Sequence, residues 1–268
     1  MARTARIEIA GIWCTPAGRS KLIPMRLLCL PHAGGGAAAY FRWTSALSAV
    51  TRVCAVRLPG RESLLAERPF TSSTAVIDEL IELLMPDLDS PYAVFGHSMG
   101  AILAFELARR IEALKLPLPR ILLVSGRPAP HLPPVSEPIH HLADVEFIAQ
   151  IRARYQGIPD DLLEDREALR LFLPAIRADM RLIETWDYHP GLPLGVPMLA
   201  LGGDRDPFAS TEAVRAWRVH SKSQFEAQFW PGGHFYLHEH PEPVMAYLAT
   251  RLAASTCQEP SPAVSRMA

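Results

Sequence analysis

The sequence has few cysteines, no long apolar run and almost no net charge, and each absence excludes a class of protein. The four cysteines form no CxxC pair, so reduced core thiols are expected rather than a zinc or disulfide framework. No stretch approaches the roughly 20 apolar residues of a membrane span, and the N-terminal MARTARIEIAGIW lacks the apolar run of a signal peptide. A formal net charge of -1 creates no global field that would recruit nucleic acid or an anionic membrane. We therefore expect a cytoplasmic protein with neither of these partners.

The chain instead has ordinary globular composition, with 49% apolar and 21% charged residues over 268 positions. This length is sufficient for one large domain with a substantial core, which we expect over residues 1–256. Residues 257–268 contain proline and serine without apolar periodicity, a composition typical of a disordered tail. No coiled-coil repeat is present, so a monomer is expected.

Short apolar runs alternate with segments of helical period, which predicts an α/β fold with a mostly parallel sheet. The predicted strands are Arg26–Leu30, Arg52–Leu58, Tyr92–Phe95, Arg120–Ser125, Met198–Leu201 and Phe225–Trp230, with a further strand near Ile7–Ile12. The predicted helices between and after them are Ser72–Met85, Ala101–Leu114, Glu212–Val219 and Glu242–Leu252.

The alternation is interrupted over about residues 128–190, where no strand is predicted. This segment opens with the proline-rich Arg127–Pro138, and helical periods follow at Leu142–Tyr155, near Asp160–Leu163 and at Arg166–Trp186. Long insertions in compact domains are usually functional, so we interpret it as a lid above the strand ends. The alternative is a purely structural helical subdomain.

The segment Tyr92–Gly100, YAVFGHSMG, contains the G-x-S-x-G pattern between a predicted strand and a predicted helix. Gly96 and Gly100 flank Ser98 at the two positions where a sharp turn tolerates only small residues. This context predicts a nucleophile elbow of the α/β-hydrolase fold, with the backbone N–H of Met99 directed at an oxyanion. The alternative is that Ser98 only caps the following helix.

A serine nucleophile needs a base and an orienting acid, which follow it in this fold in the order Ser, Asp or Glu, His. His234 follows the last predicted strand in the glycine-rich WPGGHFYL, and we prefer it to His238 and His240, which lie closer to the final helix. Asp204 and Asp206 both follow the preceding strand. We choose Asp206 because it lies further out on its loop, while Asp204 is suited to stabilising the turn.

A second oxyanion donor is expected in the loop PHAGGGAAAYFRW, Pro31 to Trp43, where Ala33 is the best candidate. His32 precedes the serine and is therefore interpreted as a loop-shaping residue rather than the base. The loop is not a phosphate cradle, because no G-K-[ST] follows it. No spacing of His, Asp or Glu suggests a metal site, and no cofactor is expected.

In these segments the sequence resembles the type II thioesterases, the stand-alone editing hydrolases of polyketide and non-ribosomal peptide synthetases. The resemblance spans roughly residues 26–250. It rests on LCLPHAGGG (28–36), VRLPGRES (56–63), VFGHSMGAILAFELARR (94–110), LLVSGRPAP (122–130), FLPAIRADM (172–180), LALGGDRDPF (199–208) and FWPGGHFYL (229–237).

The resemblance implies that Ser98 accepts the acyl group, with Asp206 and His234 as its triad partners. Met99 and Ala33 would then form the oxyanion hole, and the insertion would cover the acyl chamber. The implied substrate is an acyl or aminoacyl thioester on the phosphopantetheine arm of an acyl- or peptidyl-carrier protein. The implied reaction is hydrolysis, which restores the carrier thiol.

Three alternatives remain open at this stage: a carboxylesterase or lipase, an acyltransferase, and a non-catalytic module that binds carrier proteins. Arginines of the insertion could steer an acidic carrier protein, although a solvated face interleaved with acidic residues is the favoured interpretation. These arginines include Arg152, Arg154, Arg166, Arg170, Arg177 and Arg181.

Overall fold

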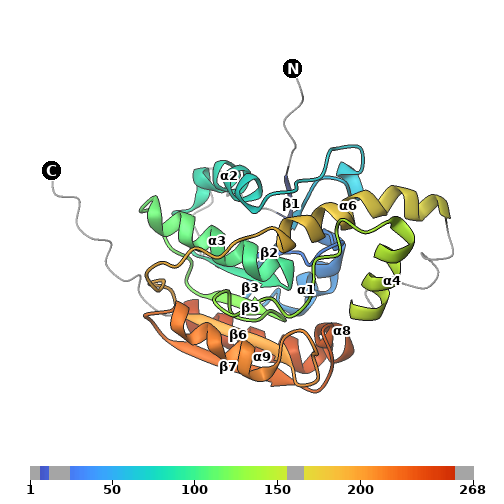
Figure 1. Ribbon diagram of the computed structural model, residues 1–268. Coiled ribbons are helices and arrows are strands. Elements are labelled where there is room, and N and C mark those ends of the chain that lie inside the picture. The colour runs from blue at the N-terminus through green and yellow to red at the C-terminus, as the bar shows by residue number, and fades with distance from the viewer. Residues whose placement is uncertain (1–6, 12–24, 156–165, 257–268) are drawn as a thin grey trace.

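The computed structural model describes residues 7–11, 25–155 and 166–256, which form a seven-stranded sheet covered by helices on both faces (Figure 1). The strand order is β1-β3-β2-β4-β5-β6-β7. All neighbouring pairs are parallel except β1 with β3, which is antiparallel. The strands are β1 (Glu8–Ala10), β2 (Met25–Leu30), β3 (Thr51–Arg57), β4 (Tyr92–His97), β5 (Leu122–Ser125), β6 (Met198–Gly203) and β7 (Phe225–Trp230). The predicted parallel α/β fold is confirmed.

One strand end differs from the prediction in a way that matters for the site. β4 continues to His97, two residues beyond the predicted end at Phe95. Gly96 and His97 pair with Val124 and Ser125 of β5, so the ladder continues although neither residue belongs to an apolar run. The strand consequently leads directly into Ser98, without an intervening loop.

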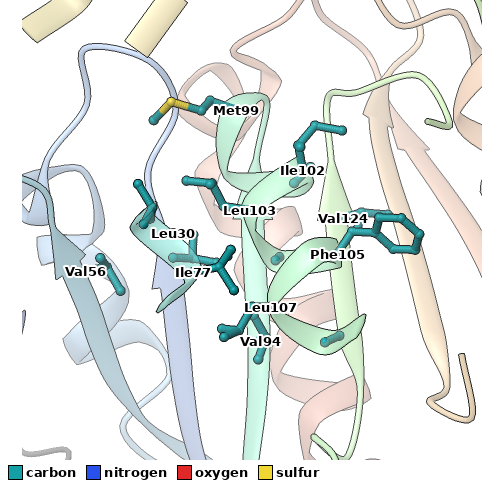
Figure 2. Packing of buried hydrophobic residues seen from close by; sticks show 14 of the residues in the cluster. Leu30, Val56, Ile77, Val94, Met99, Ile102, Leu103, Phe105, Leu107 and Val124 are labelled. Atoms are coloured by element: carbon teal, nitrogen blue, oxygen red, sulfur yellow. The ribbon is translucent and has the colours of Figure 1, made fainter. Parts of the chain in front are cut away.

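The core follows from the alternation of side chains along buried strands. In β2, Leu28 and Leu30 belong to the cluster that contains residues of α2 (Ser73–Leu84) and α3 (Met99–Ala113). Leu27 and Cys29 belong to the opposite cluster, with residues of α8 (Tyr236–Glu239) and α9 (Pro241–Thr256). Figure 2 shows the first cluster, in which Ile77 and Leu107 of the two helices lie over side chains of the strands. Each such buried aliphatic side chain contributes roughly 1.5–3 kcal/mol to folding.

The other described helical segments outside the insertion are short and connect the strands. They are η1 (Ala37–Tyr40), α1 (Phe41–Ala46), η2 (Glu62–Leu64), η3 (Met85–Asp87), α7 (Thr211–Arg215) and η4 (Ala216–His220). The single predicted helix over Glu212–Val219 is therefore two consecutive pieces, α7 and η4.

The insertion between β5 and β6 contains α4 (Asp144–Tyr155) and the 19-residue α6 (Arg166–Glu184), as the helical periods predict. The short helix expected near Asp160–Leu163 and the tail 257–268 lie outside the described residues. The apolar face of α6 joins the core of the sheet domain through residues that include Leu173, Ile176 and Met180. The described part of the insertion thus packs onto the body of the protein, and most of its buried apolar residues belong to the core of the sheet domain.

The cysteines within the described residues are buried. Cys29 and Cys54 are free thiols, as expected, and burial raises the pKa of Cys54 to about 11. Cys14 and Cys257 lie outside the described residues. Among the described helices, none is both long enough and apolar enough to span a bilayer.

Candidate active site

Ser98 occupies a strained turn between β4 and α3. Its φ of 55° and ψ of -110° lie where non-glycine residues are rarely found, and its amide donates to Ser125 O over 2.8 Å. Ser98 is at the N-cap position of α3, yet its side chain makes no capping hydrogen bond. Its Oγ instead lies 3.0 Å from His234 Nε2, which argues against a capping role.

Two glycines make this turn possible by removing side chains where backbones meet. A Cβ on Gly96 would lie 1.9 Å from the carbonyl oxygen of Gly100, and one on Gly100 would lie 2.2 Å from Leu30 O. Backbone atoms cannot move aside as side chains do, so the predicted steric need for small residues on both sides of Ser98 is confirmed.

His234 is brought to Ser98 by the loop after β7. This loop lies against the end of β6, because a Cβ on Gly203 would lie 2.3 Å from Gly233 O and 2.5 Å from Gly232 O. Gly232 itself has a φ of 133°, which favours glycine. Among the other two histidines considered, His238 lies in α8 and His240 follows it.

Asp206 lies on the other side of His234, with its Oδ2 2.8 Å from Nδ1. An ionised Asp206 accepts the Nδ1 proton, which leaves Nε2 free to accept the Ser98 hydroxyl proton. Asp204 makes a different contact, accepting the amide of Gly232 over 3.1 Å. The structure therefore brings together Ser98, His234 and Asp206, all less than 10% exposed, and gives Asp204 the turn contact expected of it.

A pocket opens beside this chain of hydrogen bonds, and the insertion forms one of its walls. Its lining includes Ser98, His234 and three residues of the loop after β2, His32, Ala33 and Gly34. Apolar side chains close it: Phe235, Ile151 of α4, and Ile176, Met180 and Ile183 of α6. Ala33 thus lines the pocket. The amide of Met99 begins the 15-residue α3, whose N-terminus favours developing negative charge.

Two further histidines, His97 and His32, lie near His234. His97 Nδ1 lies 2.9 Å from Ser125 Oγ, which lies 2.7 Å from Tyr236 OH, and the His97 ring is 5.0 Å from that of His234. Burial holds the pKa of His97 well below its ordinary value, with the neighbouring His234 acting in the same direction. Burial also lowers the pKa of His32 to about 4. Both rings are neutral near pH 7, so neither adds a positive charge that would oppose protonation of His234.

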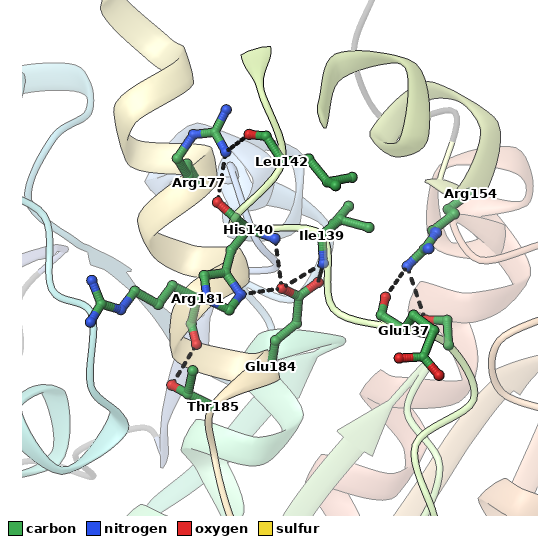
Figure 3. Close-up of polar contacts among 10 residues, drawn as sticks. Glu137, Ile139, His140, Leu142, Arg154, Arg177, Arg181, Glu184 and Thr185 are labelled. Atoms are coloured by element: carbon green, nitrogen blue, oxygen red, sulfur yellow. Dashed lines mark hydrogen bonds and ion pairs between the residues drawn. The ribbon is translucent and has the colours of Figure 1, made fainter. Parts of the chain in front are cut away.

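Two of the insertion arginines, Arg177 and Arg154, have hydrogen-bond partners within the insertion. Arg177 donates to the carbonyls of His140 and Leu142 (Figure 3). It also donates to Asp144 Oδ1, and its guanidinium lies 4.2 Å from the ring centroid of Phe147. Arg154 likewise donates to Ser136 Oγ and Glu137 O. These contacts join parts of the insertion to one another. Because the guanidinium of Arg177 is occupied by them, it is unsuited to act as a free positive charge for docking.

Sequence reasoning missed a buried ion pair beside the pocket, between Arg61 and Asp179. Both residues fall in segments that carry the family resemblance, 56–63 and 172–180, but nothing in either segment indicates the other as its partner. Charged residues in otherwise apolar, buried segments were the available signal, since such charges are almost always paired. Within the described residues, no group of three or more His, Cys, Asp or Glu side chains is placed to hold a metal ion.

The sequence profile of the Thioesterase domain matches residues 25–252. The chain belongs to the thioesterase family. As a thioesterase with this sheet and elbow, it is a serine hydrolase of the α/β-hydrolase fold.

Individual relatives agree with this assignment. The thioesterase is 35% identical to the gramicidin S biosynthesis protein GrsT of Aneurinibacillus migulanus, covering 90% of this chain and 93% of the relative. It is 39% identical to thioesterase PikA5 of Streptomyces venezuelae, over 86% of this chain and 82% of the relative. Among solved structures, the type II thioesterase BorB from the borrelidin biosynthetic cluster is 40% identical. It superposes with a TM-score of 0.79, covering 92% of this chain and 97% of BorB.

Proposed function

We propose that this thioesterase hydrolyses acyl or aminoacyl thioesters from the phosphopantetheine arm of carrier proteins. It would thereby edit or regenerate a polyketide or non-ribosomal peptide synthetase as a stand-alone enzyme. The observation that carries the proposal is the buried hydrogen-bond chain from Ser98 through His234 to Asp206, beside a pocket with apolar walls. It is supported by relatives of similar extent that are named for gramicidin S biosynthesis and as a type II thioesterase.

In the proposed acylation step, Ser98 Oγ attacks the thioester carbonyl carbon while His234 Nε2 takes the hydroxyl proton. The carbonyl oxygen becomes an oxyanion, which the amides of Met99 and Ala33 stabilise. The C–S bond then breaks, and the phosphopantetheine thiolate leaves with the proton from His234. A thiolate is a good leaving group, so this chemistry requires no metal ion.

Deacylation repeats these steps with water as the nucleophile. His234 takes a proton from water as the oxygen attacks the acyl-Ser98 ester, and then returns it to Ser98 Oγ as the carboxylic acid leaves. Asp206 keeps the histidine in the tautomer that both steps need and stabilises the imidazolium between them. The apolar side chains of α4 and α6 hold the acyl group at the pocket and limit access of bulk water.

The test is to load a carrier protein with a short acyl group and to follow acyl loss by intact-mass spectrometry. Wild type should release the acid, and Ser98→Ala should be slower by roughly three powers of ten or more. A wild type that leaves the carrier loaded would contradict the proposal. Faster turnover of simple oxygen esters would instead identify a carboxylesterase, and an ester or amide product would identify an acyltransferase.

Three cheaper measurements address the remaining parts of the proposal. Labelling by a fluorophosphonate in wild type but not in Ser98→Ala is expected of an active nucleophile, whereas a non-catalytic carrier-binding module would not be labelled. We also propose that the enzyme acts as a monomer in the cytoplasm. Light scattering at micromolar concentration and cell fractionation test these two points.

A further inference from the structure

Arg61, in the loop after β3, forms a buried ion pair with Asp179, on the insertion helix α6. Two guanidinium nitrogens of Arg61 each lie 2.8 Å from a different carboxylate oxygen of Asp179. The residues are 4% and 2% exposed, and 118 positions separate them in the sequence. A buried pair with two matched contacts is rigid, because moving either partner leaves an uncompensated charge in the interior.

Both partners also bind the loop that carries the proposed oxyanion donor. The amide of Gly34 donates to Asp179 Oδ2 over 2.8 Å, and Arg61 donates to Gly35 O over 2.7 Å. His32 Nδ1 lies 3.0 Å from Ala33 O, so the peptide between Ala33 and Gly34 is held at its carbonyl and at its amide. The orientation of the adjacent Ala33 amide is thereby restricted by these contacts.

Close packing of α6 against the two loops reinforces these contacts. A Cβ on Gly34, whose φ is +76°, would lie 3.1 Å from Ile176 Cγ1. A Cβ on Gly60, whose φ is +84°, would lie 3.2 Å from Ala175 Cβ. The helix α6 therefore packs closely against both loops, at positions where glycine has no side chain. A shift of α6 would disturb the contacts that hold the loop after β2.

We propose that Arg61 and Asp179 are positioning residues that fix the oxyanion loop from the insertion helix. The same face of α6 supplies Ile176 and Met180 to the pocket wall and Asp179 to the Gly34 amide. The packing of α6 would then both close the acyl pocket and order the oxyanion hole. This inference rests on the proposed function, since it assigns a task to the amide of Ala33.

The experiment compares Asp179→Ala with Glu184→Ala, which also loosens α6 but does so away from the oxyanion loop. Glu184 accepts hydrogen bonds from the amides of Ile139 and His140, at the start of the insertion (Figure 3). The substrate is a short-acyl thioester of N-acetylcysteamine, which carries the end of the pantetheine arm without the carrier protein. Values of kcat and KM are measured well below the unfolding temperature of each variant.

Loss of oxyanion stabilisation lowers kcat without weakening ground-state binding, so Asp179→Ala should lose roughly 10- to 100-fold in kcat with KM within about threefold of wild type. Glu184→Ala should keep kcat within about threefold. Asp179→Asn retains an oxygen acceptor for the Gly34 amide and should lie between wild type and Asp179→Ala. Equal kcat for the two alanine variants, or for the two Asp179 variants, would overturn the inference.

If Asp179→Ala does not fold, Asp179→Asn and Glu184→Gln form the same comparison with smaller perturbations. A lower kcat in Asp179→Asn alone supports the inference, and equal values overturn it. Wild-type activity separates this test from that of the function. A wild type inactive on every thioester contradicts the proposed function, whereas an active wild type with unaffected Asp179 variants contradicts only the positioning role.

Discussion

His234 Nδ1 lies 2.8 Å from Asp206 Oδ2, while Asp204, two residues earlier on the same loop, accepts the amide of Gly232. The loop after β6 thus directs one carboxylate inward to the imidazole and the other along the turn. Because the two residues are chemically identical and adjacent to the same strand, they form a matched pair for testing which carboxylate serves the reaction.

Asp206→Asn should reduce kcat by about four powers of ten, because the amide stabilises the wrong imidazole tautomer and cannot compensate the imidazolium. Asp204→Asn should retain most of the wild-type rate, since an amide oxygen can still accept from Gly232. Single-turnover rates on an acylated carrier protein measure both. Similar losses in the two variants would contradict the assignment of the acid to Asp206.

Gly96→Ala should prevent the elbow from forming, because its methyl group would lie 1.9 Å from a backbone oxygen that cannot move aside. We expect destabilisation by more than about 4 kcal/mol, measured by urea denaturation or seen as loss of soluble protein. Gly233→Ala is the control, since the nearest atom to its added Cβ is the flexible end of Glu239 at 3.8 Å. Equal urea midpoints for the two variants would show that the turn tolerates a side chain.

Glu184→Ala should lower the free energy of unfolding by about 2 kcal/mol. The carboxylate accepts the amides of Ile139 and His140, and its removal leaves these partly buried donors without that acceptor. Glu184→Gln keeps one acceptor oxygen and should cost less. The urea midpoints of the three proteins provide the measurement, and an unchanged midpoint in Glu184→Ala would indicate that solvent satisfies both amides.

His220 should make the protein sensitive to acid. Burial, followed by the nearby His131 and Arg109, lowers its pKa to about 4, whereas the unfolded chain binds this proton near pH 6.5. Between these values the unfolded state holds more protons, so stability decreases as the pH falls from 6.5 towards 4 and is unaffected by this residue above 7.

Urea denaturation at several pH values tests this, with His220→Phe as the variant because the ring packs against Phe105 and Trp217. The slope of stability against pH between 6.5 and 5 should decrease in the variant by up to one proton, about 1.4 kcal/mol per pH unit. Slopes measured above pH 7 should be the same in both proteins. An unchanged acid slope would mean that His220 is protonated in the folded state.

The sequence predicted the sheet well because buried parallel strands have few exceptions to their apolar pattern. The end of β4 was placed too early because Gly96 and His97 extend the ladder through backbone hydrogen bonds, which a pattern of side chains does not record. The elbow was predictable because a short pattern records it: two glycines flank Ser98 between an apolar run and a segment of helical period. The structure adds that the clash expected at Gly100 involves Leu30 of another strand.

Long-range relationships were harder to predict. Arg61 and Asp179 are far apart in the sequence, and their pairing depends on how the insertion folds back over the loop after β2. Arg177 was considered as a surface charge, but it binds the carbonyls of His140 and Leu142, which are available only because of the local path of the chain. The charge of an arginine does not by itself indicate whether its side chain faces solvent or binds backbone carbonyls.

The hydrogen bond between Ser98 and His234 joins residues 136 positions apart, and His234 follows β7, which is an edge strand and the last described strand along the chain. Contacts of such sequence separation form late in folding, because the intervening chain must first lose its freedom. A nascent chain that has not yet released β7 from the ribosome would therefore hold a formed elbow with no base beside it. Regain of thioesterase activity during refolding would report the docking of this final strand, and would lag behind signals from α3 and the central strands.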